Sequence, residues 1–513
     1  MLGKLFGGAV YGVDALTITI EVNVSGGKPG YFLVGLPDSA VKESLFRIES
    51  ALTASGYRMP RQKIVINLAP ADIRKEGSAY DLPIAIAILA ASNQLEIRKL
   101  GNYFIMGELS MDGSIQRIRG ALPLAIQAAE ENFEGFILPK ANCREAALVD
   151  AIRVFGMETL SEVIDFLGGK VEAAPVKIES KAEFYRQLNH YEQDFSDVKG
   201  QENIKRALEI AAAGGHNVIL VGPPGAGKTM LAKRLPTILP QLNLQEALES
   251  TKIYSVAGKL PMANALMTER PFRAPHHTIS DVALVGGGIN PQPGEISLAH
   301  NGVLFLDELP EFKRAVLEVM RQPLEDRRVS ISRARFSVEY PSSFMLIASM
   351  NPCPCGFYNH PEKDCICAPG IVQKYLSKIS GPLLDRIDLH VEVTPVNFTA
   401  LSSSRATEKS SEIRTRVMKA RKIQELRFAS LENLFFNAQM SPNMVRQLCQ
   451  VNDHGQTLIK QAMERLGLSA RAYDRILKVA RTIADLAESE NIEIEHLAEA
   501  IHYRSLDRES WTG

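Results

Sequence analysis

The segment GPPGAGKT, Gly222 to Thr229, combines the residue types that hold a polyphosphate. It follows an apolar run, NVILV, and precedes a helix-like run, which is the setting in which such a loop binds nucleotide. Gly225 and Gly227 let backbone N–H groups close around phosphate oxygens, and Lys228 reaches the β- and γ-phosphates. Thr229 is the expected Mg²⁺ ligand. We expect ATP to contact the whole loop: Gly222, Pro223, Pro224, Gly225, Ala226, Gly227, Lys228 and Thr229.

Two adjacent acids end a second apolar run, GVLFLDEL. Asp307 is expected to help hold Mg²⁺, and Glu308 to polarise the attacking water, because phosphoryl transfer depends on positioning and charge neutralisation. Asn351 ends a third run, LIASMN, where its side chain could orient the water against the γ-phosphate. This series of residues predicts an ATP-hydrolysing enzyme.

Two arginines further along the chain extend this set. Arg386 follows a tight turn in GPLLDRIDL, and an arginine offered by a neighbouring subunit can stabilise charge on the transferred phosphoryl group. Arg471 stands at the head of a predicted helix in LSARAYDR. Either arginine alone is more often a surface charge, but their order and spacing favour functional roles.

Four of the six cysteines crowd into NPCPCGFYNHPEKDCICAPG, as two Cys-x-Cys pairs nine residues apart. Four thiolates are the usual ligands of a closed structural zinc site, which would shape a loop and do no chemistry. The alternatives are reduced structural cysteines, an iron–sulfur cluster or a redox pair, and His360 could replace one thiol. We predict Zn²⁺ bound by Cys353, Cys355, Cys365 and Cys367.

The segment from Lys313 to Arg335 carries seven basic residues against three acidic ones. Its pattern predicts a helix followed by a hairpin around Asp326 to Val329, with Arg327 and Arg328 at the tip, where they could grip DNA phosphates. A solvated helix face with cross-strand ion pairs is an equally weighted alternative. The adjacent histidines of APHHT could suggest a metal, but we favour contacts within a loop.

Composition limits the class of protein. The 513 residues exceed one ordinary core, so two or three domains are expected. Hydrophobic residues make up 45% and charged residues 23%, which is typical of a globular, ordered chain. No apolar run is long enough to span a bilayer, and the start is a poor secretory signal, so we expect a cytoplasmic protein. The net charge of −1 means that nucleic-acid contact would need a local basic patch.

These residues must be positioned by an α/β fold. Residues 1–170 alternate strand-like and helix-like runs, and 171–190 read as a linker. Residues 191–395 contain continuous apolar runs, which are typical of a parallel sheet buried on both faces, and 352–369 form the cysteine module within them. Residues 396–513 are predicted to be mostly helical.

The series GPPGAGKT, LFLDE, SMNP, LLDRID and LSARAYDR resembles the magnesium-chelatase branch of the AAA+ ATPases. APHHTISDVALVGGG is similar to that branch's insertion. With the N-terminal region and the cysteine cluster, the chain resembles the ComM/YifB family over essentially its whole length. The resemblance implies that Asn351 is a sensor-1 residue, Arg386 an inter-subunit arginine finger and Arg471 a sensor-2 arginine. It also implies a homohexameric ring with branch-migration helicase activity on branched or single-stranded DNA, serving recombination in natural transformation.

The N-terminal region resembles the proteolytic domain of Lon proteases, a ribosomal S5 domain 2-like fold, in KEGSAYDLP and GELSMDGSIQRIRGA. That family cleaves peptides with a serine activated by a lysine. Here Ala79 occupies the serine position, with Ser78 one residue away, and Leu122 lies near the lysine position. We therefore expect a non-catalytic domain that binds DNA or builds the ring.

Three functions remain open on this basis. A ring motor that moves branched DNA is the leading hypothesis, a chelatase-type AAA+ chaperone subunit is the second, and an ATP-dependent protease is the third. A chelatase motor would not need the Lon-like domain or the cysteine cluster, and the protease lacks its lysine.

Overall fold

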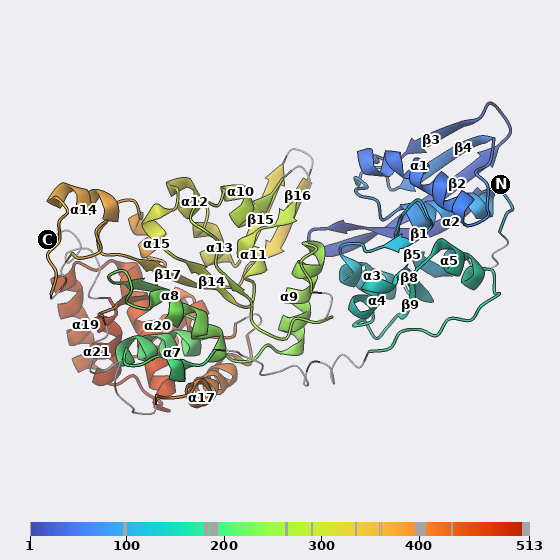
Figure 1. Cartoon of the computed structure of the whole chain (residues 1–513). Helices are drawn as coiled ribbons and strands as arrows, with labels where there is room; N and C mark the ends of the chain where they lie inside the picture. Colours follow the sequence, from blue (N-terminus) through green and yellow to red (C-terminus); the bar gives the residue numbers. More distant parts are fainter. Residues whose placement is uncertain are drawn as a thin grey trace.

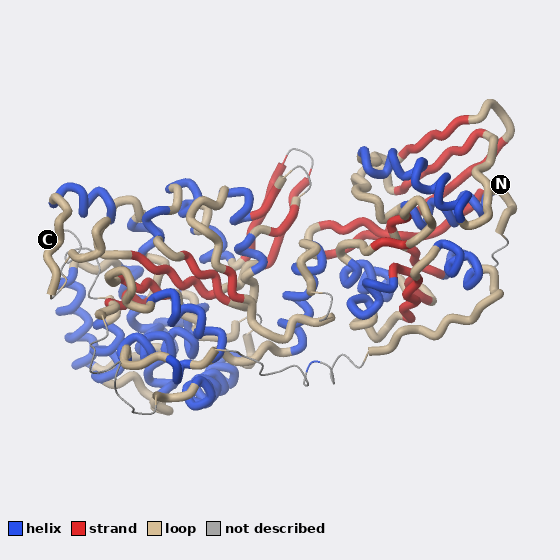
Figure 2. Tube along the Cα trace, in the orientation of Figure 1, coloured by secondary structure: helices blue, strands red, loops and turns tan. Residues whose placement is uncertain are grey.

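The structure, a computed structural model, describes residues 2–95, 100–178, 184, 193–261, 265–288, 291–333, 336–358, 360, 362–395, 407–431 and 434–504. Two bodies follow one another along the chain, each built around its own β-sheet (Figure 1). Figure 2 shows that helices dominate the C-terminal end, whereas the longest strands lie at the N-terminal end. The fold is mixed α/β with a parallel sheet and a helical C-terminal region, as the sequence predicts.

The N-terminal body is organised by a seven-stranded mixed sheet in the order β3-β4-β2-β1-β5-β8-β9. Strands β1 and β2 pair antiparallel along the whole of β1, from Leu2↔Asn23 to Tyr11↔Asp14. A small hairpin, β6 with β7, turns through Asp112-Gly113. The strands are β1 (Leu2–Tyr11), β2 (Asp14–Ser25), β3 (Gly30–Val34), β4 (Lys63–Ala69), β5 (Tyr103–Ile105), β6 (Glu108–Leu109), β7 (Ile115–Gln116), β8 (Gly135–Pro139) and β9 (Arg153–Met157).

Apolar residues at every second position give β2 one buried face, on which Ile18, Ile20 and Val22 are fully buried. Helix α2 packs on this sheet and is buried almost all round, which explains its nearly unbroken apolar sequence. Gly3 of β1 permits this approach, because a Cβ there would lie 2.6 Å from the Ala87 carbonyl oxygen. The helices are α1 (Ser39–Ala54), α2 (Asp81–Ala91), α3 (Ala121–Glu130), α4 (Lys140–Ala146) and α5 (Leu160–Leu167), with a 3₁₀ turn at Leu100–Asn102.

The second body is organised by a five-stranded parallel sheet in the order β11-β14-β17-β10-β18. Every residue of β10, β14 and β17 is buried, because helices cover both faces. This burial accounts for the continuous apolar runs in the sequence. The strands are β10 (Val218–Val221), β11 (Phe272–Arg273), β14 (Val303–Leu306), β17 (Met345–Met350) and β18 (Leu389–Glu392).

Shorter elements fill the connections of this sheet. The longer helices among them are α7 (Glu202–Gly214), α8 (Lys228–Arg234), α9 (Leu244–Val256) and α14 (Pro369–Leu376). The remainder are α10 (Asp281–Val285), β12 (Gly286–Gly287), β13 (Gln292–Pro293), α11 (Glu295–Leu298), α12 (Arg314–Glu318), α13 (Arg321–Asp326), α15 (Gly381–Leu384) and 3₁₀ turns at Phe195–Asp197, Leu235–Thr237 and Leu309–Glu311.

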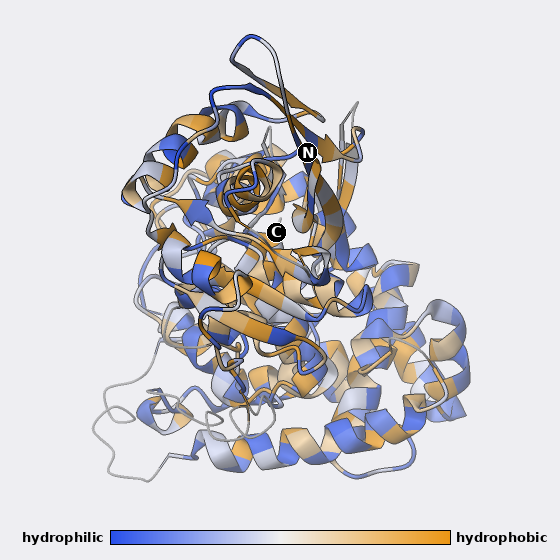
Figure 3. Cartoon of the chain, turned by 90° about the vertical axis from the view of Figure 1, so that its right-hand side faces the viewer, coloured by the Kyte–Doolittle hydropathy of each residue, from blue (hydrophilic) through white to orange (hydrophobic). Residues whose placement is uncertain are grey.

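A helical group follows the sheet. In α17, buried residues recur at helical spacing, at Ile413, Val417, Ala420, Gln424 and Phe428, so one face packs inward. Figure 3 shows the same alternation of apolar and polar residues along surface helices. The group comprises α17 (Ser410–Phe428), α18 (Pro442–Leu448), α19 (Asp453–Leu466), α20 (Ala470–Leu486) and α21 (Ile494–His502), with a 3₁₀ turn at Asn437–Gln439.

The hairpin predicted around Asp326 to Val329 is wrong in its position. Helix α13 ends at Asp326, and the antiparallel strands are β15 (Arg328–Arg333) and β16 (Phe336–Pro341). The pairing runs from Arg328↔Pro341 to Arg333↔Phe336, so the base of the hairpin lies where its tip was expected. The sequence between the two strands carries no turn signal, because Arg333 to Phe336 include no glycine, proline or Asn-Gly pair.

The two bodies meet at α9 and at the β15–β16 hairpin (Figure 1). The Gly120 N–H donates to the Ser255 carbonyl at 3.1 Å, and the Arg117 guanidinium to the Leu260 carbonyl at 3.0 Å. The Tyr11 hydroxyl donates to the Ser337 carbonyl oxygen at 2.8 Å. A shared apolar cluster contains Leu122, Leu148, Leu242, Ala247, Ala265 and Leu266.

Within the described part of the chain, none of the helices has the length and apolar character required to cross a membrane. Of the predicted linker, residues 179–183 and 185–190 lie outside the described residues. The predicted domain boundaries remain predictions.

Candidate functional site

The parallel strands bring three separate segments to one edge of the sheet. Val221 of β10 pairs with Met350 of β17, and Leu306 of β14 pairs with Ala348. The residues that follow these strands therefore meet, and the Gly222 N–H donates to the Met350 carbonyl at 3.1 Å. The carboxyl ends of parallel strands are the usual place for a ligand site in such sheets.

The glycine-rich loop needs its glycines for two different reasons. Gly225 and Gly227 have φ of 80° and 84°, a left-handed conformation that side chains disfavour. Gly222 instead lacks space, since a Cβ there would lie 2.3 Å from the Val393 carbonyl oxygen. A Cβ added at Gly225 would meet no heavy atom within 4 Å, so at this position the backbone conformation alone accounts for the glycine.

The Lys228 ammonium lies inside the loop. It donates to the carbonyl oxygens of Gly222 and Pro223 at 2.7 Å and 2.9 Å, and to Asn351 Oδ1 at 3.0 Å. Burial lowers the pKa of Lys228, and the carboxylates of Asp307 and Glu308 act in the opposite direction. The lysine and Asn351, predicted as parts of one site from distant segments, are therefore in direct contact.

Asp307 accepts hydrogen bonds from two hydroxyl groups. Thr229 Oγ1 donates to Asp307 Oδ2 at 2.7 Å, and the Ser349 hydroxyl donates to Asp307 Oδ1. The threonine–aspartate pair presents two oxygen ligands side by side, which suits Mg²⁺. Ser349 was missed in the sequence, although it lies two residues before Asn351 on a strand, and such residues share a face.

Glu308 adopts a left-handed conformation, with φ of 54°, and its side chain is 57% exposed. Its carboxylate lies 3.5 Å from Nδ1 of His277, in the segment that precedes α10. The centres of the His276 and His277 rings are 4.1 Å apart, and His276 Nδ1 also lies 2.9 Å from the Thr278 hydroxyl. The loop contacts predicted for these histidines therefore include one to an acid of the site.

The cysteine segment begins two residues after Asn351, and its four sulfur atoms lie within 4.8 Å of one another. The Sγ–Sγ separations are 3.3 Å for Cys353 and Cys355, 3.7 Å for Cys353 and Cys365, and 3.6 Å for Cys355 and Cys365. Four sulfurs at about 2.3 Å from one Zn²⁺ would stand about 3.8 Å apart, so the cluster fits a tetrahedral ion with little adjustment. The fourth sulfur of the group belongs to Cys367.

The alternative ligand His360 is not part of this group. Its Nδ1 accepts a hydrogen bond from the Glu362 N–H at 3.0 Å. The segment also touches the phosphate loop, because a Cβ at Gly356, where φ is 84°, would lie 2.4 Å from Pro224 Cδ. The cysteine cluster and the glycine-rich loop are therefore packed against each other.

Arg386 lies at the opposite end of the strands from the phosphate loop. It precedes β18, whose residues Leu389 to Glu392 pair in parallel with Val218 to Val221 of β10. A four-residue strand spans about 13 Å, so the side chain does not share the edge that holds Lys228. The guanidinium pairs with Glu325 and donates to the Pro382 carbonyl at 2.6 Å, which leaves the side chain 12% exposed.

Arg471 is exposed in the first turn of α20, after the N-cap residue Ser469. One turn further on, Arg475 pairs with the buried Asp388 of the segment before β18. Burial alone would raise the pKa of Asp388, but Arg475 and then His216 outweigh it and hold the pKa well below its usual value. This ion pair, which sequence reasoning missed, joins the helical group to the sheet.

The two adjacent arginines that were predicted to contact DNA have different environments in the structure. The Arg327 guanidinium lies 4.9 Å from the centre of the Phe436 ring and donates to Ser343 Oγ at 3.3 Å, and burial lowers its pKa to about 10. It is therefore committed to internal packing and does not stand at a hairpin tip. Arg328 is exposed and pairs across the hairpin with Glu339 at 3.4 Å, which is the ion-pair alternative.

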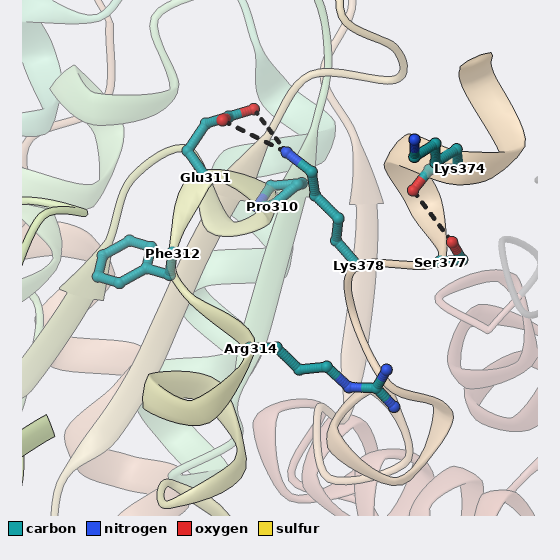
Figure 4. A pocket seen from close by; sticks show the side chains of 7 residues that line it. All are labelled: Pro310, Glu311, Phe312, Arg314, Lys374, Ser377 and Lys378. Carbon is teal, nitrogen blue, oxygen red and sulfur yellow. Dashed lines mark hydrogen bonds and ion pairs between the residues drawn. The ribbon is translucent and has the colours of Figure 1, made fainter.

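A pocket of about 360 Å³ opens directly after the acid pair in sequence (Figure 4). Lys378 reaches Glu311 at 3.4 Å across it. Among the described residues, Arg314 and Lys374 have no acidic partner, so the pocket carries net positive charge. Its lining comprises Pro310, Glu311, Phe312, Arg314, Lys374, Ser377 and Lys378.

The N-terminal body places no lysine at the predicted position of a protease base. Leu122 is fully buried in the apolar cluster shared with α9. Lys75, four residues before Ala79 in the chain, is also fully buried, and its ammonium donates to the carbonyl oxygens of Pro70 and Ile73. Its charge is thus used to satisfy backbone carbonyls.

Three family models match successive parts of this chain. Residues 194–401 match the family model "Magnesium chelatase, subunit ChlI", and residues 407–504 match "Magnesium chelatase, subunit ChlI C-terminal". Residues 20–142 match "Subunit ChlI of Mg-chelatase". The chain is also 33% identical over 159 residues to Lon protease 2 of Bacillus subtilis, covering 28% of this chain and 27% of that protein.

Two relatives match along nearly the whole length. The competence protein ComM of Haemophilus influenzae is 44% identical over 99% of this chain and 98% of its own. YifB of Escherichia coli K12, an uncharacterized protein, is 45% identical over 98% of this chain and 96% of its own. The chain therefore belongs to the ComM/YifB family of magnesium-chelatase-like AAA+ proteins.

Proposed function

We propose that this protein is an ATP-hydrolysing ring motor that acts on DNA. The observation that carries the ATPase assignment is the meeting of Lys228 with Asn351, and of Thr229 with Asp307, at one edge of the parallel sheet. Three segments distant in sequence supply a cation, oxygen ligands and a polar amide at one place. Phosphoryl transfer needs these groups together.

Each residue has a distinct task in this mechanism. Lys228 exchanges its loop carbonyls for phosphate oxygens, and the N–H groups of Gly225 and Gly227 close around the polyphosphate. Thr229 and Asp307 would hold Mg²⁺, which when bound would neutralise charge on the phosphates. Glu308 polarises the attacking water, and Asn351 orients it. Ser349 keeps the Asp307 carboxylate in place.

The assignment to DNA rests on the relatives and on local charge. The name of the Haemophilus influenzae relative describes a competence protein, and we take branch migration during natural transformation as the corresponding activity. The pocket with Arg314, Lys374 and Lys378 supplies a basic surface beside the acid pair. Arg328 is exposed on the hairpin but pairs with Glu339, and Arg327 packs against Phe436, so neither arginine carries the proposal.

The chelatase-type function is the second candidate, because the three family models carry that name. The near-complete match to a competence protein favours DNA over a tetrapyrrole. A protease would need a base beside its serine, and the expected position is held by the buried Leu122.

A four-way DNA junction should stimulate the ATPase rate of the full chain and be separated into forks in an ATP-dependent manner. The measurement compares ATP turnover without DNA, with the junction, with a porphyrin plus chelatase partner subunits, and with an unfolded protein. Labelled-strand gels report on the junction, and Glu308→Gln serves as the inactive control. Stimulation by porphyrin or unfolded protein without any by DNA would overturn the proposal.

Two substitutions should separate nucleotide binding from hydrolysis. Lys228→Ala removes the ammonium within the loop and should weaken binding of a fluorescent ATP analogue. Glu308→Gln keeps the shape of the side chain but not its charge, so it should bind ATP while its turnover falls by about a hundredfold or more. Turnover of the Glu308→Gln protein at the wild-type rate would show that this acid is not the base.

Purified protein should contain about one Zn²⁺ per chain, bound by the four clustered thiols. Replacing Cys353, Cys355, Cys365 and Cys367 by serine should abolish the metal content found by elemental analysis. Replacing Cys143 and Cys449, the two described cysteines outside the cluster, by alanine is the matched control and should leave it unchanged. Iron in place of zinc, or zinc retained by the quadruple variant, would contradict the assignment.

Arg386 should act across a subunit interface of a hexamer, because it lies at the far end of the strands from its own phosphate loop. Arg386→Ala should bind ATP normally and lose roughly a thousandfold in hydrolysis. Mixing it with the Glu308→Gln protein should restore activity, since some interfaces then combine an intact Glu308 with a neighbour's Arg386.

Co-assembly of the two variants is verified by pull-down of differently tagged chains. If mixed rings form and no activity returns, Arg386 serves instead as the structural partner of Glu325.

A further inference from the structure

The imidazole of His277 contacts the Glu308 carboxylate from outside the segment that carries the acids. Nδ1 lies 3.5 Å from Glu308 Oε2, with the His277 side chain 31% exposed. The two residues come from different connections of the sheet, one before α10 and the other at the end of β14. This contact is not part of the magnesium or phosphate arrangement described above.

Glu308 depends on such a partner for its orientation. Its backbone is fixed by the left-handed conformation, and its N–H donates to Asp307 Oδ1 at 3.1 Å. The side chain beyond that point is more than half exposed. An exposed glutamate samples several rotamers, whereas a catalytic base must hold one geometry relative to its water.

His277 is itself held from two sides. The His276 ring lies 4.1 Å away at an angle of 34°, and the Phe312 ring meets it edge-on at 6.4 Å. Phe312 is buried, so this side of the imidazole rests on a fixed surface. His276 is fixed in turn by Thr278, whose hydroxyl lies 2.9 Å from its Nδ1.

Glu308 stands in the chain directly beside a residue that contacts the phosphate loop. It follows Asp307, whose Oδ2 accepts a hydrogen bond from Thr229 Oγ1 of the loop at 2.7 Å. A base oriented by a third group, with the reacting atoms on its other side, is the common arrangement in activated catalytic pairs.

We propose that His277 is a positioning residue that orients Glu308 for ATP hydrolysis, so that the segment before α10 contributes to the rate of the chemical step. This inference rests on the proposed ATPase function. It predicts a specific kinetic effect: loss of the imidazole lowers kcat, because the base is misplaced, but leaves KM for ATP nearly unchanged, because no phosphate contact is lost.

The test uses the full chain and steady-state ATP hydrolysis. His277→Ala should lower kcat by roughly ten- to a hundredfold, with KM for ATP changed less than about twofold. His277→Asn should recover part of the loss, because the asparagine Nδ2 occupies the place of the histidine Nδ1 and can donate. His454→Ala, which removes an exposed imidazole from α19, is the matched control and should retain the activity, since this histidine is not part of the His277–Glu308 contact.

A double variant separates positioning from a structural role. In the Glu308→Gln background, His277→Ala should cause no further loss of residual turnover, because the orienting contact has no base to act on. An unchanged kcat in His277→Ala, or a full additional loss in the double variant, would overturn the inference. A wild-type protein without ATPase activity would instead refute the proposed function, so the two failures are distinguishable.

Discussion

The parallel pairing of β10, β14 and β17 is the constraint on which the site depends. Because the three strands run in one direction, the loop after Val221, the acids after Leu306 and the amide at Asn351 emerge at the same edge. The pairing is maintained by burial of every residue in these strands. Any shift of one strand would separate Lys228 from Asn351. The packing of the core therefore determines the positions of the site residues.

Much of this arrangement could be predicted from the sequence. The loop Gly222 to Thr229, the acids and Asn351 each end an apolar run, and strand ends of a parallel sheet meet without any further information. The cysteine cluster was predictable because all four thiols lie in one short segment. The sequence was therefore enough to predict the parts of the site whose residues lie close together in the chain or end neighbouring parallel strands.

The remaining features depend on contacts between distant segments. Nothing in APHHT indicates that His277 reaches Glu308, and nothing in DRID indicates that Asp388 pairs with Arg475 of the helical group. Arg327 was misplaced for a similar reason: its partner Phe436 belongs to the helical group, more than a hundred residues later. Charge in a sequence shows which residues can bind an anion, but burial decides which of them remain available.

Gly356 of the cysteine segment lies so close to Pro224 of the phosphate loop that the conformation of each segment limits that of the other. Neither loop can be exchanged for that of a distant relative without its counterpart, since any side chain at position 356 would press directly on the turn that surrounds the polyphosphate. A larger residue at position 356 would therefore require the two loops to move apart or Pro224 to change with it. A chimeric protein that carried a foreign cysteine segment would thus also alter the packing of the glycine-rich loop.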